Sequence, residues 1–246
     1  MTVFDDLGAE QGRLEGILAG LDEAQWRSPS AAQGWTVADV VLHLAQSEEA
    51  VQATMTGSQL RTGIFAATGS TMDERAEAAV QAERTAPAEV FCRWQRAHRA
   101  AMAALTAGDP EVPVRWVTGP VKPATLATTR LAEHWAHGLD ITGPLGLDYP
   151  DTGRLRHVAW LAHRTLPYAL ALAGEPADAA VRCELTAPAG SHTWRYGPPD
   201  AESVITGPAG EFCRVAVRRL APADAGLSAT GPHGAIALRV LRTYAQ

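Results

Sequence analysis

The sequence predicts an all-α up-down helical bundle followed by a small α+β domain, and three observations carry this prediction. Apolar residues recur at helical spacing over most of residues 1–175. From residue 176 onward they alternate with polar residues, as in half-buried strands. The 246 residues, 46% hydrophobic and 20% charged, are enough for two packed cores. We therefore expect a bundle over residues 1–175 and an α+β domain over residues 176–246.

Two helices are indicated near the start of the chain. The first carries an apolar stripe at i, i+3, i+4 and i+7, formed by Leu14, Ile17, Leu18 and Leu21. It should end before Ser28-Pro29-Ser30. The second should begin after Gly34-Trp35, with Thr36 as its N-cap and Asp39 placed to complete a capping box. Its buried stripe is then Val37, Val40, Val41 and Leu44.

A loop and a third helix are expected next. Residues 56–71 combine glycines with many Ser and Thr residues, a composition typical of loops. Pro87 suits the first turn of a helix that should run to Gly108. Further prolines and a glycine then indicate a stiff connector, at Pro110, Pro113, Gly119, Pro120 and Pro123.

The remaining bundle helices should span residues 124–141 and 152–173, and four or five antiparallel helices of this length favour an up-down arrangement. Beyond them, alternating or β-rich runs predict three short strands, at residues 181–185, 193–196 and 203–205. Two closing helices are expected at residues 208–220 and 233–245.

Charge and composition narrow the possible partners. With 21 Lys+Arg against 27 Asp+Glu, the net charge of −6 gives no electrostatic support for a nucleic-acid partner. Charged residues or prolines interrupt every apolar stretch before the roughly 18 residues that a membrane span requires, and no secretory signal is visible. The three cysteines lie far apart, as expected in a reducing cytoplasm. We expect a cytoplasmic monomer or homodimer that acts on a small molecule.

One helix and a distant histidine form a candidate metal site. On the helix at 124–141, Glu133 and His137 share a face, and Asp140 lies three residues further along it. His43 falls at the edge of the apolar stripe of its own helix and should point into the bundle. Together His43, Glu133 and His137 would make a three-ligand set with an open position. The alternative is an ordinary surface ion pair beside a core-edge histidine that bonds a backbone carbonyl.

No nucleophile signature accompanies these residues, since the chain lacks G-x-S-x-G, a glycine-rich phosphate loop and a cysteine in a cationic setting. A nucleophile would then come from bound water or a cosubstrate. In the second half, Arg219 lies on the more apolar side of its helix, where a guanidinium could grip the carboxylate of a substrate. Its alternative role is a snorkelling surface side chain.

These residues resemble a known family. The segment Gly34-Trp35-Thr36-Val37 leading to His43, and the segment 130–140, look like the metal-binding bundle of the mycothiol-dependent maleylpyruvate isomerases of the DinB-like superfamily, in an actinobacterial metal-binding subgroup. The resemblance continues through the second half, as at Ile205-Thr206-Gly207-Pro208. It implies a DinB-like bundle, a metal triad at His43, Glu133 and His137, and a helix-end arginine at Arg219, with Arg218, one residue earlier, as the alternative.

The resemblance implies a divalent-metal enzyme, with zinc as first choice and a mycothiol-like thiol as cosubstrate. The metal would favour the thiolate, which would add to a small electrophile and permit isomerisation or S-transfer. Asp140 or a backbone carbonyl would orient His137, and Arg219 would hold a substrate carboxylate. Two alternatives stay open: a thiol-independent lyase, hydrolase or cyclase of specialised metabolism, and a non-catalytic metalloprotein that binds a ligand.

Overall fold

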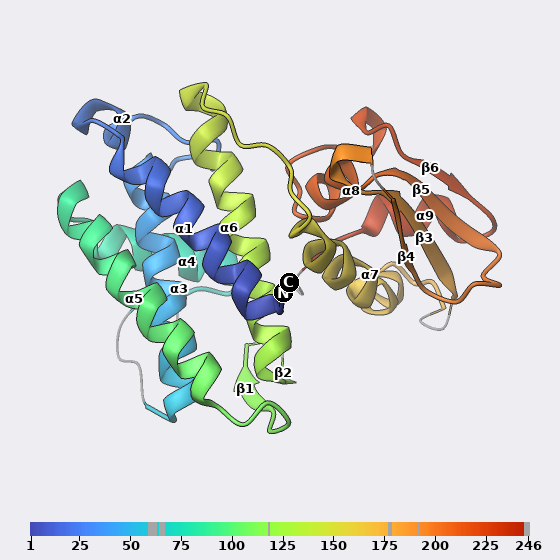
Figure 1. Ribbon diagram of the computed structural model, residues 1–246, viewed down its shortest axis with the longest axis horizontal. Coiled ribbons are helices and arrows are strands. Elements are labelled where there is room, and N and C mark those ends of the chain that lie inside the picture. Colours follow the sequence, from blue (N-terminus) through green and yellow to red (C-terminus); the bar gives the residue numbers. More distant parts are fainter. Residues whose placement is uncertain (59–62, 64–66, 118, 177–178, 191, 244–246) are drawn as a thin grey trace. The chain divides into compact units, whose positions relative to one another are not determined.

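The computed structural model describes residues 1–243 apart from 59–62, 64–66, 118, 177, 178 and 191. Contacts between Cα atoms divide the chain into two compact units, residues 1–149 and 150–245. The first contains most of the long helices and the second contains a four-stranded sheet with its own helices (Figure 1). This is the predicted fold class, a helical bundle followed by a small α+β unit.

The first unit is built from helices that run alongside one another (Figure 1). They are α1 (Val3–Ala19), α2 (Glu23–Arg27), α3 (Val37–Thr56), α4 (Met72–Ala82), α5 (Pro87–Ala107) and α6 (Pro123–Leu145). The core between them is apolar, and its largest fully buried side chains include Trp94, Trp135, Leu14 and Leu44. The predicted helices that begin after Trp35, at Pro87 and near residue 124 are confirmed, whereas the expected first helix is divided by residues 20–22 into α1 and the short α2. Much of the predicted loop at residues 56–71 lies outside the described residues.

The N-terminus of α3 confirms the predicted capping box. Asp39 N–H donates to Thr36 Oγ1 at 3.2 Å, while Thr36 N–H donates to the Asp39 carboxylate at 2.9 Å. The same carboxylate accepts from Arg84 Nε at 2.8 Å. Because these bonds satisfy exposed backbone donors, they fix where α3 starts, and with it the position of His43 two turns further on.

The first unit differs from the expectation in three places. Helix α4 occupies residues to which no element was assigned, and it buries only Ala79 and Val80, too few apolar residues for a visible stripe. The expected stiff connector contains an antiparallel hairpin of β1 (Val114–Trp116) and β2 (Gly119–Val121). Helix α6 also continues past Gly143 to Leu145, with Pro144 inside its last turn.

The second unit combines a sheet with three helices. Its strands are β3 (Val181–Thr186), β4 (Thr193–Tyr196), β5 (Ser203–Pro208) and β6 (Ser228–Thr230), in the order β4-β3-β5-β6. Strands β3 and β5 are parallel and the other pairs antiparallel. Its helices are α7 (Leu155–Leu172), α8 (Ala209–Ala216) and α9 (Gly234–Val240), with 3₁₀ turns at Pro188–Gly190 and Pro222–Asp224. The three predicted strands are confirmed, and β6 was not anticipated.

Helix α7 belongs to the second unit, so the division lies at residue 150 rather than near residue 175 as expected. Tyr196 Oη on β4 donates to Arg156 O at 2.9 Å, and His163 Nε2 lies 2.9 Å from Val181 O on β3. The buried stripe of α7 packs against α8 and α9. The helical period of residues 155–172 predicts that one face of this helix is buried. It does not predict whether that face packs against the bundle or against the second unit.

Helix α8 ends earlier than the predicted range. Arg218 adopts a left-handed conformation with φ 60°. Arg218 N–H donates to Val215 O at 3.0 Å and Arg219 N–H donates to Arg214 O at 2.8 Å, the two bonds of a Schellman motif. This motif terminates the helix at Ala216 and places Arg219 just beyond it.

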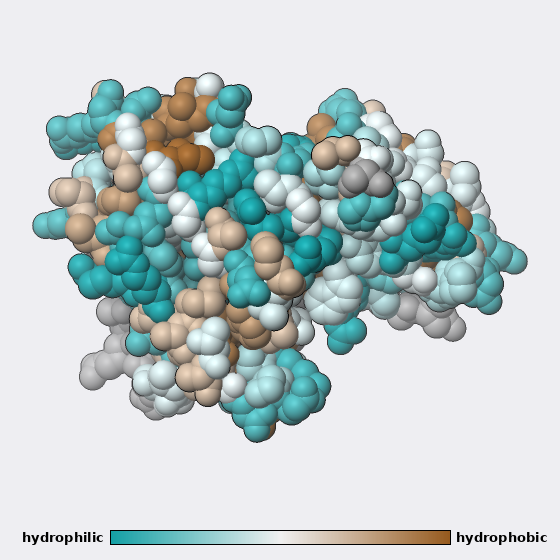
Figure 2. Space-filling model, viewed as in Figure 1, coloured by the Kyte–Doolittle hydropathy of each residue, from teal (hydrophilic) through white to brown (hydrophobic). Residues whose placement is uncertain are grey.

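None of the described helices combines the length and apolar character needed to span a bilayer. The surface seen in Figure 2 carries many hydrophilic side chains, with apolar residues gathered in smaller areas. The apolar residues of the bundle are therefore used mainly for its core.

The ring of Tyr149 occupies the space beside Gly138 in α6, where an added Cβ would lie 2.5 Å from its atoms. We expect Gly138→Ala to lower the free energy of unfolding by about 1–3 kcal/mol, since the ring would have to move. Gly12→Ala in α1, where a Cβ meets nothing within 4 Å, is the matched control and should raise stability by about 0.5–1 kcal/mol. Urea unfolding followed by circular dichroism measures both. Equal effects would contradict the predicted clash.

Candidate metal centre

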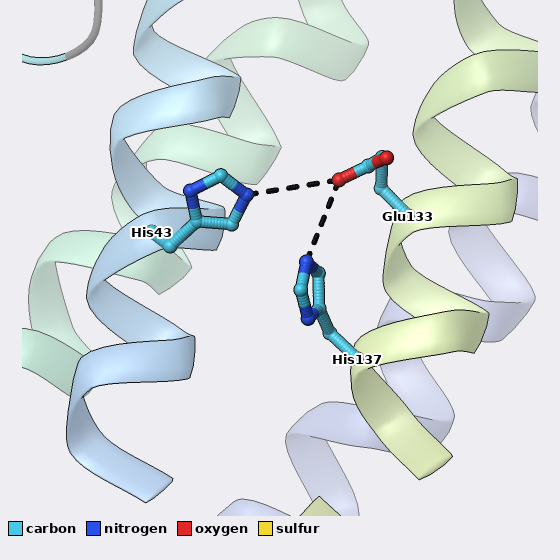
Figure 3. Close-up of side chains that lie close together, drawn as sticks. All are labelled: His43, Glu133 and His137. Atoms are coloured by element: carbon cyan, nitrogen blue, oxygen red, sulfur yellow. Dashed lines mark ion pairs between the residues drawn. The ribbon is translucent and has the colours of Figure 1, made fainter. Parts of the chain in front are cut away.

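Three side chains from two helices converge inside the first unit. His43 lies on α3, and Glu133 and His137 lie on α6 (Figure 3). Glu133 Oε2 is 3.7 Å from His43 Nε2 and 3.5 Å from His137 Nε2. The three ligand atoms all lie within 4.8 Å of one another. These are the residues that helical spacing selected, and the structure brings them together.

The cluster is mostly buried but open on one side. The side chains of His43 and His137 are 13% and 11% exposed, whereas that of Glu133 is 32% exposed. The two imidazole rings meet edge to face, with centroids 5.0 Å apart. Of the three side chains, that of Glu133 is therefore the most accessible to solvent.

Asp140 fixes the orientation of His137. His137 Nδ1–H donates to Asp140 Oδ2 at 2.9 Å, which turns Nε2 toward Glu133 Oε2, 3.5 Å away. Burial by itself would lower the pKa of His137, but the Asp140 and Glu133 carboxylates outweigh it and raise that pKa above 6.5. The expected contact between Asp140 and His137 is thus present.

The other two members of the cluster are held in the forms that bind cations. Burial lowers the pKa of His43 below 6.5, so its imidazole is neutral at pH 7. Burial would raise the pKa of Glu133, but the imidazoles of His137 and His43 beside it bring that pKa well below 4.5. The site therefore offers the Glu133 carboxylate and the neutral imidazole of His43 at neutral pH.

The geometry fits a small divalent ion. Ligand atoms about 2.0–2.2 Å from a tetrahedral zinc lie about 3.3–3.6 Å apart, close to the 3.5 and 3.7 Å seen between Glu133 and the two histidines. Two imidazoles and one carboxylate are a donor set typical of catalytic zinc, which keeps a fourth position open. Among the described residues this is the one cluster of His, Cys, Asp and Glu with such spacing.

A second buried polar group lies along the same helices and was missed by the sequence analysis. Arg130 Nε on α6 donates to Glu48 Oε1 on α3 at 2.8 Å. His134 Nδ1–H donates to Arg130 O at 2.9 Å, and its Nε2 accepts from Trp94 Nε1–H at 3.3 Å. Burial and the charge of Arg130 lower the pKa of His134 to about 3, so it stays neutral. His134 is therefore a core residue of this group.

A signal for this group was present in the sequence. Glu48 continues the apolar stripe of α3, one turn after Leu44 and three residues before Val51. A carboxylate at such a position is buried and needs a cationic partner, and Arg130 is the buried cation of the facing helix.

Arg219 lies in the second unit, beyond the end of α8. Its side chain is exposed, and its Nη1 donates to Val217 O at 2.8 Å. Its neighbour Arg214 makes a bidentate ion pair with Asp151, at 2.8 and 2.9 Å. The bidentate pair commits Arg214 to the structure of this unit.

Comparison with known proteins gives a consistent picture. The family model of the mycothiol maleylpyruvate isomerase N-terminal domain matches residues 7–142. Two proteins of Mycobacterium tuberculosis, MT0041 of strain CDC 1551 / Oshkosh and Rv0036c of strain ATCC 25618 / H37Rv, are each 32% identical over 245 residues, which cover 98% of this chain and 94% of theirs.

Crystal structures of the mycothiol-dependent maleylpyruvate isomerase and of a mutant of it share the fold. Their TM-scores are 0.63 and 0.64 at 17% identity, and each match covers 94% of both chains. The family model spans more than half of the chain and includes His43, Glu133, His137 and Asp140. The chain belongs to the family of the mycothiol maleylpyruvate isomerase N-terminal domain.

Proposed function

We propose that the chain is a divalent-metal-dependent enzyme that uses a low-molecular-weight thiol of the mycothiol type and acts on a small electrophile carrying a carboxylate. The observation that carries the proposal is the His43–Glu133–His137 cluster, with Asp140 bonded to His137. Zinc is the first choice because the donor set and the spacing suit it. Family membership supports the thiol and an isomerisation or S-transfer reaction.

The cysteines of the chain support a borrowed thiol. Burial raises the pKa of Cys183 to about 12, and Cys213 is also buried with a raised pKa. Neither forms a thiolate at neutral pH. Cys92 is exposed on α5, away from the buried cluster on α3 and α6. The nucleophile is therefore assigned to a cosubstrate.

Each residue has a defined task in this proposal. His43, Glu133 and His137 hold the ion, which when bound would favour the thiolate form of the cosubstrate at neutral pH. Asp140 keeps the proton on His137 Nδ1 so that Nε2 stays free to ligate. Arg219 holds the substrate carboxylate through two parallel hydrogen bonds.

The proposed reaction needs only the thiol and the substrate. The thiolate forms an S–C bond with one carbon of a conjugated C=C bond, whose π electrons move to the carbonyl oxygen. Rotation about the new single bond, followed by return of those electrons and loss of the same thiolate, isomerises the double bond. Protonation of the adduct at carbon gives S-transfer instead.

Purified protein should bind about one Zn²⁺ per chain. His43→Ala and His137→Ala each remove one ligand and should weaken zinc affinity at least about a hundredfold, since three protein ligands are the minimum for a catalytic site. The matched control is His192→Ala in the second unit, which should bind zinc normally. Competition with a chromophoric chelator measures all three. Full affinity in both ligand variants would rule the site out.

Zinc affinity should fall as the pH falls through the raised pKa of His137, because a proton then competes for Nε2. The slope is about tenfold per pH unit below that pKa for one displaced proton. Asp140→Asn removes the carboxylate that raises the pKa, so the onset should move to lower pH. It should also weaken affinity about 10–100-fold at pH 8. Calorimetric titrations over pH 5–8 measure both, and an unchanged onset would contradict the role of Asp140.

Turnover of a panel of unsaturated oxo acids should require added mycothiol. Arg219→Ala should lower kcat/KM by about 10–100-fold for a carboxylate substrate, the value of hydrogen bonds to a charged group, and leave its neutral amide analogue unaffected. Arg218→Ala, one residue earlier, tests the alternative arginine and should leave kcat/KM for both substrates unchanged. Steady-state assays with and without mycothiol measure kcat/KM for each variant and substrate. Full turnover without thiol would favour a thiol-independent enzyme.

A further inference from the structure

The two histidines of the cluster are held in different ways. His137 has the hydrogen bond to Asp140. His43 Nδ1 is buried and makes no hydrogen bond with any residue that the structure describes. A ligating ring needs a fixed orientation, so the orientation of His43 depends on the side chains packed against it.

The indole of Trp35 is the large side chain placed against His43. The ring centroids of Trp35 and His43 are 5.2 Å apart, with the planes inclined by 47°. His137 lies against His43 as well, at 5.0 Å. His43 is thus held between an aromatic ring from the loop before α3 and a second ligand from α6.

Trp35 is itself fixed at both its side chain and its backbone. Its Nε1–H donates to a carboxylate oxygen of Glu77 on α4. Its backbone N–H donates to Ala32 O at 3.0 Å, and its carbonyl accepts from Ser30 N–H at 2.9 Å. The indole therefore cannot turn away from His43 while these bonds are made.

Helix α4 provides a firm anchor because it is bound to α3. Gln46 Nε2 on α3 donates to Ala79 O on α4 at 3.0 Å and to Glu83 Oε2 at 3.1 Å. The helix that carries Glu77 and the helix that carries His43 thus move together. Helix α4 buries little apolar surface of its own, so its contribution to the structure is to hold Glu77 in place.

We propose that Trp35 is the positioning residue for His43 and that Glu77 anchors it, as Asp140 positions His137. The inference rests on the proposed metal site. Glu77 accepts the indole N–H, the indole limits rotation of the His43 ring, and the Nε2 atom of that ring faces Glu133. The pair acts through His43 and touches no reacting atom.

The test uses the full chain loaded with Co²⁺, whose visible absorption reports coordination geometry, together with Zn²⁺ affinity by chelator competition. Glu77→Ala removes the anchor and should weaken zinc affinity about 3–10-fold and shift the cobalt bands. Glu77→Gln keeps an oxygen acceptor for the indole N–H and should restore both to within about twofold of the original protein. Trp35→Leu removes the ring and should weaken affinity about 10–100-fold, the usual effect of losing an outer partner.

Trp160→Leu on α7 is the matched control, because it removes an exposed tryptophan in the second unit and should leave affinity and spectrum unchanged. Thermal unfolding of the metal-free variants shows whether they fold. If Glu77→Ala and Trp35→Leu fold and bind with unchanged affinity and cobalt spectrum, the positioning role is wrong. If the original protein takes up neither metal, the proposed function itself fails.

Discussion

The buried ion pair between Arg130 and Glu48 constrains the rest of the bundle. Their side chains are 4% and 0% exposed, and they join α6 to α3, the two helices that carry the candidate ligands. Removing either partner would leave an uncompensated charge in the core, which costs about 3–5 kcal/mol. Arrangements of α3 and α6 that separate the two groups are disfavoured by that amount, so the pair fixes the register at which His43 meets Glu133 and His137.

The same ion pair also sets the charges of the site. Arg130 lies three residues before Glu133, and its charge contributes to the lowered pKa values of Glu133 and of His134. Glu133 stays ionised mainly because of His137 and His43 beside it, and the charge of Arg130 adds to their effect. Asp140 acts from the opposite end of the cluster, where its backbone carbonyl accepts from Ala31 N–H at 2.9 Å. On α6, Arg130 thus joins the helix to α3, and Asp140 keeps the proton of His137 on Nδ1.

The sequence predicts features that depend on local spacing and misses those that depend on partners. The cap at Thr36, the shared face of Glu133 and His137, and the strands β3, β4 and β5 all follow from neighbours along the chain. The contacts around Glu48 and His134 form only because one particular face of α3 packs against α6. The spacing of apolar residues in the sequence does not show which faces of two helices pack together. Helix α7 shows the same limit, because its stripe is clear but the core that covers it is chosen by the tertiary fold.

The division into units separates two parts of the proposed chemistry. The ligands, Asp140 and their buried support all lie on α3 and α6, inside residues 7–142. Arg219 lies outside that range, in a unit with its own sheet and core. Substitutions around Arg219 can therefore be made without disturbing the buried pair of Arg130 and Glu48. If both proposed roles hold, the core of the bundle constrains the metal ligands but not the residues around Arg219, and a site can vary on a fold that is kept.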